Sequence, residues 1–390
     1  MSHSILIIAG ESSGDLHGAS LARALREREP DITLFGLGSH RMREAGVEVA
    51  HDVTPHAAVG VSEVVASLSA VRGAYLDMIA QLDRRRPDAA VLLDYPVFNL
   101  GFARHAHRRG NPVIYYISPQ IWAWRQGRVR KIARRVDRLL VILPFEPAFY
   151  ARHRVEARFV GHPLLDILAG YRHDRRFAEE AGLPTGRFIL GLLPGSRKRE
   201  IGVLLPTLLA AAERIDRELG GVTVAIPPAP SVPPEEYESW QKLTSVPLHI
   251  RPGRTYPVMA AADLVIVASG TATLEAGIIG TPMIVVYKLS RLTWLLGRLL
   301  VRGVRFCSLP NLIAGREVVP ELLQRQCTPD NLARRAIALA RSGLAEMADD
   351  LAANVRPRLG QPGASARAAD EILDLLHQRS KPASRQSWRS

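Results

Sequence analysis

The sequence has little cysteine and no long hydrophobic run. Only Cys307 and Cys327 occur among 390 residues, which excludes a disulfide framework and a cysteine-based zinc site and suits a reducing cytosol. No stretch reaches 18 apolar residues, so we expect no membrane-spanning helix. The apolar run Ile5–Ala9 is too short for a signal peptide and has no basic segment before it. We therefore expect a cytoplasmic protein.

Acidic residues are too few to balance the basic ones. The sequence has 51 Lys and Arg against 38 Asp and Glu, a net charge of +13. Such an excess favours an anionic partner: nucleic acid, anionic lipid or a phosphorylated substrate. A general arginine bias without any partner would give the same charge. The chain is 47% hydrophobic and 23% charged, and its length suggests two domains, each with its own core.

Both halves of the chain alternate continuous apolar runs with amphipathic segments. The first amphipathic segment predicts a helix from about Leu16 to Arg28. This pattern predicts an α/β fold of two doubly wound, Rossmann-like domains with parallel sheets. We place the boundary within residues 161–187, a loop at Pro227–Pro234 and a disordered tail from Gln378 to Ser390. The expected strands are Ile5–Ala9, Ile32–Phe35, Ala89–Leu93, Pro112–Ile117, Leu139–Leu143, Phe188–Leu193, Val222–Ile226, Leu264–Ala268 and Met283–Val286.

The first motif, Gly10–Ala19, follows the first strand directly. Its small residues allow a sharp turn into a helix that Asp15 can cap, and the free N–H groups at a helix start favour an anion. The glycine spacing matches neither the dinucleotide fingerprint nor a phosphate-binding P-loop. A purely structural turn capped by Asp15 is the alternative. His17 lies in the same segment and is a further candidate base.

A single acid, Asp94, ends the buried strand Ala89–Leu93. A carboxylate there is costly unless it is paired or used, and ligands bind at the carboxyl ends of strands in such sheets. We interpret Asp94 as a general base with a pKa raised by partial burial. A turn or helix-capping acid is the alternative.

Two tryptophans, Trp122 and Trp124, precede a dense run of arginines after residue 126. Aromatic faces beside cations suit a sugar or a lipid surface. Nucleic acid is a competing interpretation, and a solvated basic helix with core tryptophans is another.

In the second half, Leu193–Ile201 and Ala268–Ala276 each join a strand to a helix. In the first, a Gly-Ser turn, a helix start and Arg197 predict a diphosphate clamp; a salt-bridged loop is the alternative. In the second, hydroxyls and amides at a helix start suit phosphate, and Glu275 suits a ribose. A capped helix alone would give the same pattern.

The segment from Leu292 to Phe306 alternates apolar residues with arginines. Such a basic amphipathic stretch is suited to an anionic membrane surface, with roughly 1 kcal/mol from each cation near the surface. A core helix with surface arginines is the alternative. The membrane-surface candidates are Trp294, Arg298, Arg302 and Arg305.

Taken in order, these segments resemble the lipid-A-disaccharide synthase family. The matching stretches are Ala9–Ala19, Tyr116–Arg130, Leu143–Tyr150, Leu193–Arg197, Ala268–Glu275 and Ser308–Glu317. The resemblance implies a GT-B fold, with two Rossmann-like domains facing a cleft and the last helices crossing back to the first domain. It implies an inverting glycosyltransferase that condenses UDP-2,3-diacylglucosamine with 2,3-diacylglucosamine 1-phosphate. The products would be the β-1,6-linked lipid A disaccharide 1-phosphate and UDP, formed without metal or cofactor.

The resemblance also implies domains and site residues. Residues 1–165 would form an acceptor and membrane-facing domain, 166–355 a UDP-sugar-binding domain and 356–377 a helix packing back on the first domain, before the tail of 378–390. The base candidates are Asp94 and then His17; many family members carry a second acid three residues after the first, where this chain has Val97. The nucleotide and diphosphate candidates are Gly195, Ser196, Arg197, Ser269, Gly270, Thr271, Thr273, Glu275 and Asn311. The acceptor candidates are Glu11, Ser12, Asp15, Asn99, Gln120 and Trp122.

The expected partners are acylated sugar phosphates, a UDP-sugar and the cytosolic surface of the inner membrane, with no nucleic acid. The oligomeric state stays open, a homo-oligomer included. Two alternatives remain. One is a UDP-N-acetylglucosamine 2-epimerase or another GT-B enzyme, which would act on a non-acylated sugar. The other is a non-catalytic nucleic-acid or membrane-binding protein, which would show no turnover and, with DNA, a steep salt dependence.

Overall fold

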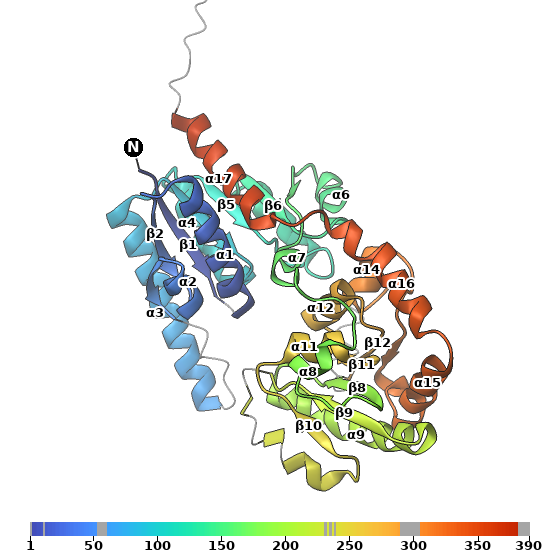
Figure 1. Cartoon of the computed structure of the whole chain (residues 1–390). Coiled ribbons are helices and arrows are strands. Elements are labelled where there is room, and N and C mark those ends of the chain that lie inside the picture. Colours follow the sequence, from blue (N-terminus) through green and yellow to red (C-terminus); the bar gives the residue numbers. More distant parts are fainter. Residues whose placement is uncertain are drawn as a thin grey trace, which may run out of the picture. The chain divides into compact units, whose positions relative to one another are not determined.

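The computed structural model describes residues 2–10, 12–52, 61–229, 232–233, 236–237, 239–288 and 305–380; for residues 12, 61–68 and 380 it describes only the backbone. The chain forms two compact units. The first comprises Met1–Pro163 and Gln361–Ser390, and the second comprises Leu164–Gly360. Figure 1 shows their elements in sequence colours.

The first unit is built on a seven-stranded sheet in the order β3-β2-β1-β4-β5-β6-β7. All its strand pairs are parallel. Its strands are β1 (Ser4–Ala9), β2 (Thr33–Leu37), β3 (Glu48–His51), β4 (Ala89–Leu93), β5 (Val113–Tyr116), β6 (Arg138–Val141) and β7 (Arg158–Phe159). Its helices are α1 (Ser12–Arg28), α2 (His40–Glu44), α3 (Val61–Arg85), α4 (Pro96–Arg108), the 3-10 turn η1 (Gln126–Arg128), α5 (Val129–Ala133), α6 (Glu146–Ala151) and α17 (Ala364–Ser380).

Helices cover both faces of this sheet. Alternate residues of β1, such as Leu6 and Ile8, share a buried cluster with Met78 of α3 and Phe102 of α4. Because successive side chains of a strand point to opposite faces, Ile5 and Ile7 belong to the other face, and both are fully buried. Strands buried on both faces explain why the apolar runs are continuous rather than alternating.

The second unit repeats the architecture with a six-stranded parallel sheet in the order β10-β9-β8-β11-β12-β13. Its strands are β8 (Phe188–Leu193), β9 (Val222–Ile226), β10 (Leu248–Ile250), β11 (Leu264–Ala268), β12 (Met283–Tyr287) and β13 (Glu321–Leu323). Its helical elements are α7 (Leu164–Ile167), α8 (Phe177–Glu180), α9 (Lys198–Leu219), η2 (Ser239–Leu243), α11 (Thr255–Ala261), α12 (Thr271–Ile279), α14 (Leu309–Ala314), η3 (Gln324–Gln326), α15 (Pro329–Arg341), α16 (Leu344–Asn354) and η4 (Arg356–Leu359). No helix within the described ranges is long and apolar enough to cross a membrane.

The last helix, α17, returns from the second unit to the first. It packs against α1 (Figure 1), and Arg138 of β6 donates to the carboxylate of Glu371 at 2.6 Å. The expected return of the C-terminal helix is therefore confirmed. The helix runs to Ser380, so the predicted tail begins too early at Gln378, and residues 381–390 lie outside the described residues.

Candidate functional site

Each sheet has one point where the strand order reverses, and the sequence motifs cluster there. In the first sheet this point lies between β1 and β4, and in the second between β8 and β11. Ligands of doubly wound folds bind outside the carboxyl ends of the strands at such points. Gly10 follows β1 and Asp94 follows β4, whereas Pro194 follows β8 and Ser269 follows β11. Each unit therefore holds one candidate site of its own.

The loops after β1 and β4 touch through Gly10 and Tyr95. A Cβ added to Gly10 would lie 2.1 Å from Cδ1 of the Tyr95 ring. No side chain fits at that distance, so glycine is required for the ring to lie over the backbone. This contact explains the glycine of the first motif better than anion binding alone.

Asp94 adopts a strained backbone at the end of β4. Asp94 and Tyr95 both have left-handed conformations, with φ values of 43° and 45°. Two successive non-glycine residues in this region are unusual and concentrate at functional sites. The Asp94 side chain is half-buried. Its N–H donates to the Ile117 carbonyl at 3.2 Å, and its own carbonyl accepts from the hydroxyl of Tyr115 at 2.5 Å.

The side chain of Asn99 stabilises this strained turn. Its fully buried amide donates to the carbonyls of Leu93 at 2.9 Å and Asp94 at 2.8 Å. These bonds hold the backbone of the turn that carries the Asp94 side chain. Asn99 therefore positions the turn, and its contact with the acceptor stays a prediction.

His17, the second base candidate, lies on α1 with 7% of its surface exposed. Burial lowers its pKa to about 4. Burial and then the charge of His17 lower the pKa of His162 to about 3. Nδ1 of His17 has no hydrogen-bond partner within the described part of the chain. His17 is therefore neutral at pH 7 but a much weaker base than an ordinary histidine.

Asp15 has a different role from the one expected. Helix α1 begins at Ser12, one turn earlier than predicted, so Asp15 does not cap its own helix. Its carboxylate instead accepts from the backbone N–H groups of Ser39 at 2.7 Å and of Arg41 and Met42 at 3.2 Å. Asp15 thus caps α2 and is 2% exposed, and its predicted contact with the acceptor is not needed to explain its place. Ser12 is the first residue of α1, and Glu11 lies outside the described residues.

The aromatic loop after β5 divides its tryptophans. Trp122 is buried against Phe145 with ring centroids 4.9 Å apart, and its role toward the acceptor stays a prediction. Trp124 is 41% exposed, and the guanidinium of Arg125 lies 4.6 Å from its ring centre. Gln120 is exposed. The exposed aromatic face beside cations therefore belongs to Trp124.

Glu146, the first residue of α6, is a buried acid that was not among the predicted site residues. Its side chain is buried, and it accepts from the backbone N–H groups of Leu143 at 2.9 Å and Ile142 at 3.2 Å. Burial raises the pKa of its carboxyl to about 8, although both backbone bonds oppose this rise. A lone acid within the apolar stretch Leu143–Tyr150 was the available signal. Glu146 holds the turn against which Trp122 packs.

The titration of Glu146 gives a pH prediction. The Glu146 carboxyl has a pKa of about 8 in the folded protein and about 4.5 in the unfolded chain. Between these two pH values the folded state binds the proton and the unfolded state does not. The free energy of unfolding therefore falls as the pH rises from about 4.5 to about 8. Glu146→Gln keeps an oxygen that can accept both bonds and removes the charge. We expect the variant to exceed the wild type at pH 8 by on the order of a few kcal/mol of unfolding free energy, and to match it near pH 5.

Urea denaturation at pH 5 and pH 8 measures this difference. Glu156→Gln is the control because the Glu156 side chain is 77% exposed and should change neither profile. An unchanged pH dependence in Glu146→Gln would show that this carboxyl is not a buried titrating group.

In the second unit, the loop after β8 is closed by Glu200 of α9. Gly195 has a φ of 118°, a backbone that favours glycine. The N–H of Ser196 donates to the Glu200 carboxylate at 3.4 Å, and Arg197 lies 3.6 Å from the same carboxylate. The Arg197 side chain is 81% exposed. The loop therefore presents donors at a helix start, and Glu200 is their internal acceptor.

The loop after β11 begins α12 with small, accessible residues. Gly270 and Thr271 are exposed, and no heavy atom lies within 4 Å of a Cβ built on Gly270. Thr273 is fully buried and donates to the Gly270 carbonyl at 2.7 Å. Ser269 donates to the Cys307 carbonyl at 2.9 Å. The side chains of Thr273 and Ser269 thus fix the turn. The backbone amides of Gly270 and Thr271 lie at the start of α12.

Glu275 lies one helical turn further along α12. Its Oε1 accepts from the hydroxyl of Tyr256 at 3.2 Å. Burial raises the pKa of its carboxyl, and this hydrogen bond partly opposes the rise. A carboxylate oxygen already bound by one hydroxyl is suited to accept from another.

Asn311 uses its whole amide inside the protein. Its Nδ2 donates to the Val319 carbonyl at 2.9 Å and the Glu321 carboxylate at 2.8 Å. Its Oδ1 accepts from the N–H groups of Val318 at 2.7 Å and Val319 at 3.0 Å. Two donor hydrogens and two lone pairs are the full capacity of this group. In this structure the Asn311 amide therefore has no hydrogen-bonding capacity left for a nucleotide.

Of the four membrane-surface candidates, Trp294, Arg298 and Arg302 lie outside the described residues. Arg305 is exposed, and its guanidinium lies 5.2 Å from the ring centre of Phe306. The amphipathic stretch therefore remains a prediction.

The comparison with known proteins identifies the family. The model of the lipid-A-disaccharide synthetase family matches residues 5–368. The chain belongs to this family. A lipid-A-disaccharide synthase of Myxococcus xanthus is 44% identical over 374 residues, covering 95% of this chain and 97% of the relative. That of Trichlorobacter lovleyi is 41% identical over 375 residues, covering 96% and 98%.

Solved structures agree on the fold. A Staphylococcus aureus MnaA–UDP structure has a TM-score of 0.66 at 13% identity and covers 98% of this chain and 99% of that one. The MurG structure of Acinetobacter baumannii has a TM-score of 0.58 at 14% identity, covering 96% and 100%. At such identities the likeness shows a GT-B fold alone. Membership of the lipid-A-disaccharide synthetase family shows a glycosyltransferase of lipid A biosynthesis.

Proposed function

We propose that the protein joins UDP-2,3-diacylglucosamine to 2,3-diacylglucosamine 1-phosphate, giving the β-1,6-linked disaccharide 1-phosphate and UDP. The observation that carries this proposal is the match to lipid-A-disaccharide synthases at 41–44% identity over 95–96% of the chain. The motifs at both strand-order reversals support it. The UDP-N-acetylglucosamine 2-epimerase alternative rests on solved epimerase structures that are 11–14% identical to this chain, and such identities support the fold alone.

In this proposal Asp94 is the general base. It takes the proton from the 6-hydroxyl of the acceptor while that oxygen bonds to the anomeric carbon of the donor. The bond from the anomeric carbon to the diphosphate breaks, and its electron pair leaves with UDP. The strained, half-buried Asp94 at the end of β4 supports this role, and Val97 in the next turn is 74% exposed and cannot serve as an acid. His17 is the second candidate.

The departing diphosphate gains negative charge, which preorganised donors stabilise. We assign this task to the amides of Gly270 and Thr271 at the start of α12 and to the loop from Gly195 to Arg197. Arginine offers a planar fork that matches phosphate oxygens. Glu275 is assigned to a ribose hydroxyl. These donors supply the positive charge, so this mechanism includes no metal or cofactor.

Arg197→Ala tests the clamp. A charge-assisted hydrogen bond contributes about 1.5–3 kcal/mol, so we expect the UDP dissociation constant to rise about tenfold or more in isothermal titration. Arg199→Ala is the matched control, since Arg199 is an exposed arginine in the first turn of the same helix and should leave UDP binding unchanged. Equal binding by Arg197→Ala and the wild type would remove Arg197 from the clamp.

We also propose that the protein works at the cytosolic surface of the inner membrane, where its acylated substrates reside. The net charge of +13 and the exposed Trp124 beside Arg125 support this.

Substitution of Arg298, Arg302 and Arg305 by serine tests the membrane contact. It should reduce the fraction of protein that co-sediments with anionic vesicles. Sedimentation equal to that of the wild type would return this stretch to a core helix with surface arginines.

The reaction is tested by UDP release from the acylated donor in mild detergent, with and without the acceptor, and with and without EDTA. We expect acceptor-dependent release, a disaccharide phosphate product and the same initial rate in EDTA. No release from this donor, together with turnover of a non-acylated UDP-sugar, would favour the epimerase alternative. No turnover of either would favour a binding protein.

A further inference from the structure

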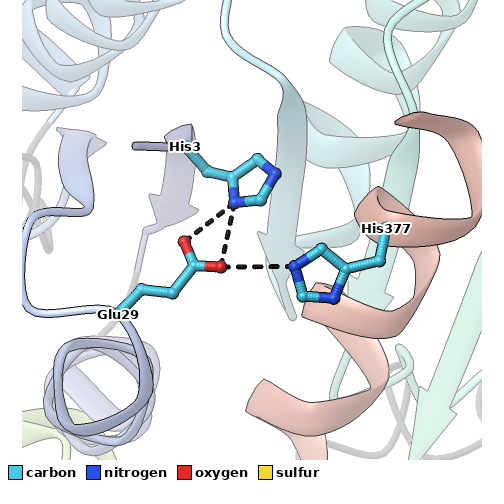
Figure 2. Close-up of side chains that lie close together, drawn as sticks. All are labelled: His3, Glu29 and His377. Atoms are coloured by element: carbon cyan, nitrogen blue, oxygen red, sulfur yellow. Dashed lines mark hydrogen bonds and ion pairs between the residues drawn. The ribbon is translucent and has the colours of Figure 1, made fainter. Parts of the chain in front are cut away.

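Three side chains from distant parts of the sequence meet at the amino-terminal edge of the first sheet. His3 immediately precedes β1, Glu29 immediately follows α1, and His377 lies in the last turn of α17. Figure 2 shows the Glu29 carboxylate facing both imidazole rings, with dashed lines to each. All three residues belong to the first unit.

The donor atoms of the cluster converge. Nδ1 of His3 lies 2.8 and 3.0 Å from the carboxylate oxygens of Glu29, and Nε2 of His377 lies 3.5 Å from one of them. One ligand atom from each residue can be chosen so that all three lie within 4.8 Å of one another. Ligands bound tetrahedrally at 2.0–2.1 Å are separated by about 3.3 Å, so small rotations of the side chains would enclose one ion.

The chemical nature of the donors selects the ion. Two imidazoles and one carboxylate suit zinc and related transition-metal ions, whereas calcium and magnesium prefer oxygen ligands only. Two neutral imidazoles and one carboxylate leave a net positive charge on bound zinc. A fourth position then stays open to water.

The backbone holds two of the ligands before any ion binds. The carbonyl of His3 accepts from Thr33 of β2 at 2.9 Å, and the N–H of Glu29 donates to Leu25 of α1 at 2.9 Å. The side chains of His3 and Glu29 are 14% and 22% exposed, and that of His377 is 57% exposed. A half-formed site with one accessible ligand gives an ion a route of entry.

We propose that His3, Glu29 and His377 bind one zinc ion, which fastens the last turn of α17 to the start of β1 and the end of α1. Arg28 and Asp370 already pair the middle of α17 with α1, with 3.1 Å between Nη2 and Oδ2. The zinc ion extends this attachment to the end of the helix. It closes a loop from residue 3 to residue 377, and clips that close long loops restrict the unfolded chain most.

The zinc site is structural and separate from the transfer reaction. His3 precedes the amino end of β1, whereas Asp94 follows the carboxyl end of the neighbouring strand β4. A six-residue strand is about 20 Å long. The proposal therefore does not depend on the catalytic role of Asp94, and its test needs no substrate.

Titration of zinc chloride into the tag-free, chelator-stripped full chain measures the site. We expect one tightly bound zinc ion per chain and a rise in the thermal midpoint on binding. His377→Ala should weaken zinc binding by at least about tenfold, since even an outer-sphere partner contributes 10–100-fold, and should abolish the thermal shift. Glu29→Gln tests the carboxylate and should also weaken binding.

The matched control is His107→Ala, which removes an exposed histidine from the last turn of α4 in the same unit and should bind zinc like the wild type. Circular dichroism of the zinc-free variants checks that each is folded. Absence of one-to-one binding to the wild type overturns the proposal. So does equal zinc affinity of folded His377→Ala and wild type, which would place the ion elsewhere in the chain.

Discussion

Asp94→Asn is expected to lower kcat about 10²–10⁴-fold, the usual contribution of a positioned general base, and to leave UDP binding unchanged. Asparagine has nearly the same shape as aspartate but cannot take a proton from the acceptor hydroxyl. The bonds that hold this turn come from the backbone of Asp94, namely its N–H to Ile117 and its carbonyl to Asn99 and Tyr115. The substitution preserves them, so the loss should appear in kcat rather than in folding.

Asp88→Asn is the matched control at the opposite end of the same strand. Asp88 precedes β4 and accepts from the N–H of Ser4 at 2.7 Å, a bond that an asparagine oxygen can also accept. We expect its kcat to stay within about twofold of the wild type. Full activity of Asp94→Asn would transfer the role of base to His17, whose substitution should then abolish turnover.

The central strands of both sheets were predictable because each is buried on both faces. The runs at β1, β4, β8 and β11 coincide with the predicted strands. The edge strands β3, β7, β10 and β13 were not predicted. Each has only two to four residues, and residues of edge strands are partly exposed, so they lack a continuous apolar run. Their place in the sheet comes from pairing with a neighbour.

The loops of the candidate site were predictable from the sequence, but the roles of individual polar residues in them were not. Asp15, Asn99 and Asn311 are all among the predicted site residues. Each, however, binds backbone groups of its own unit and is buried. Sequence patterns show that a polar residue follows a strand, whereas tertiary packing decides whether its side chain faces solvent or the loop beneath it. His3, Glu29 and His377 could not be found this way because no local motif joins them.

Asn311→Asp is expected to be the most destabilising of the substitutions considered. Its amide donates to the Val319 carbonyl and the Glu321 carboxylate, and a carboxylate at this position would face both acceptors without a donor. Glu321 also accepts from the N–H groups of Cys307 at 2.8 Å and Ser308 at 2.9 Å, so a displaced Glu321 would release the start of α14. Leaving a buried charge uncompensated costs about 3–5 kcal/mol.

For a domain of this size, that loss corresponds to a fall in thermal midpoint of roughly 6–20 °C. Asn331→Asp is the control. The Asn331 amide makes one exposed bond to the Gln326 carbonyl at 3.1 Å, and Asn331 lies in the first turn of α15, where an acid is favourable. Its midpoint should move by no more than about 2 °C, since surface changes are usually within 0.5 kcal/mol.

Differential scanning calorimetry measures both midpoints. Equal midpoints of Asn311→Asp and wild type would show that the Asn311 amide is not fixed by the four bonds. Asn311 would then again be a candidate for direct contact with the nucleotide.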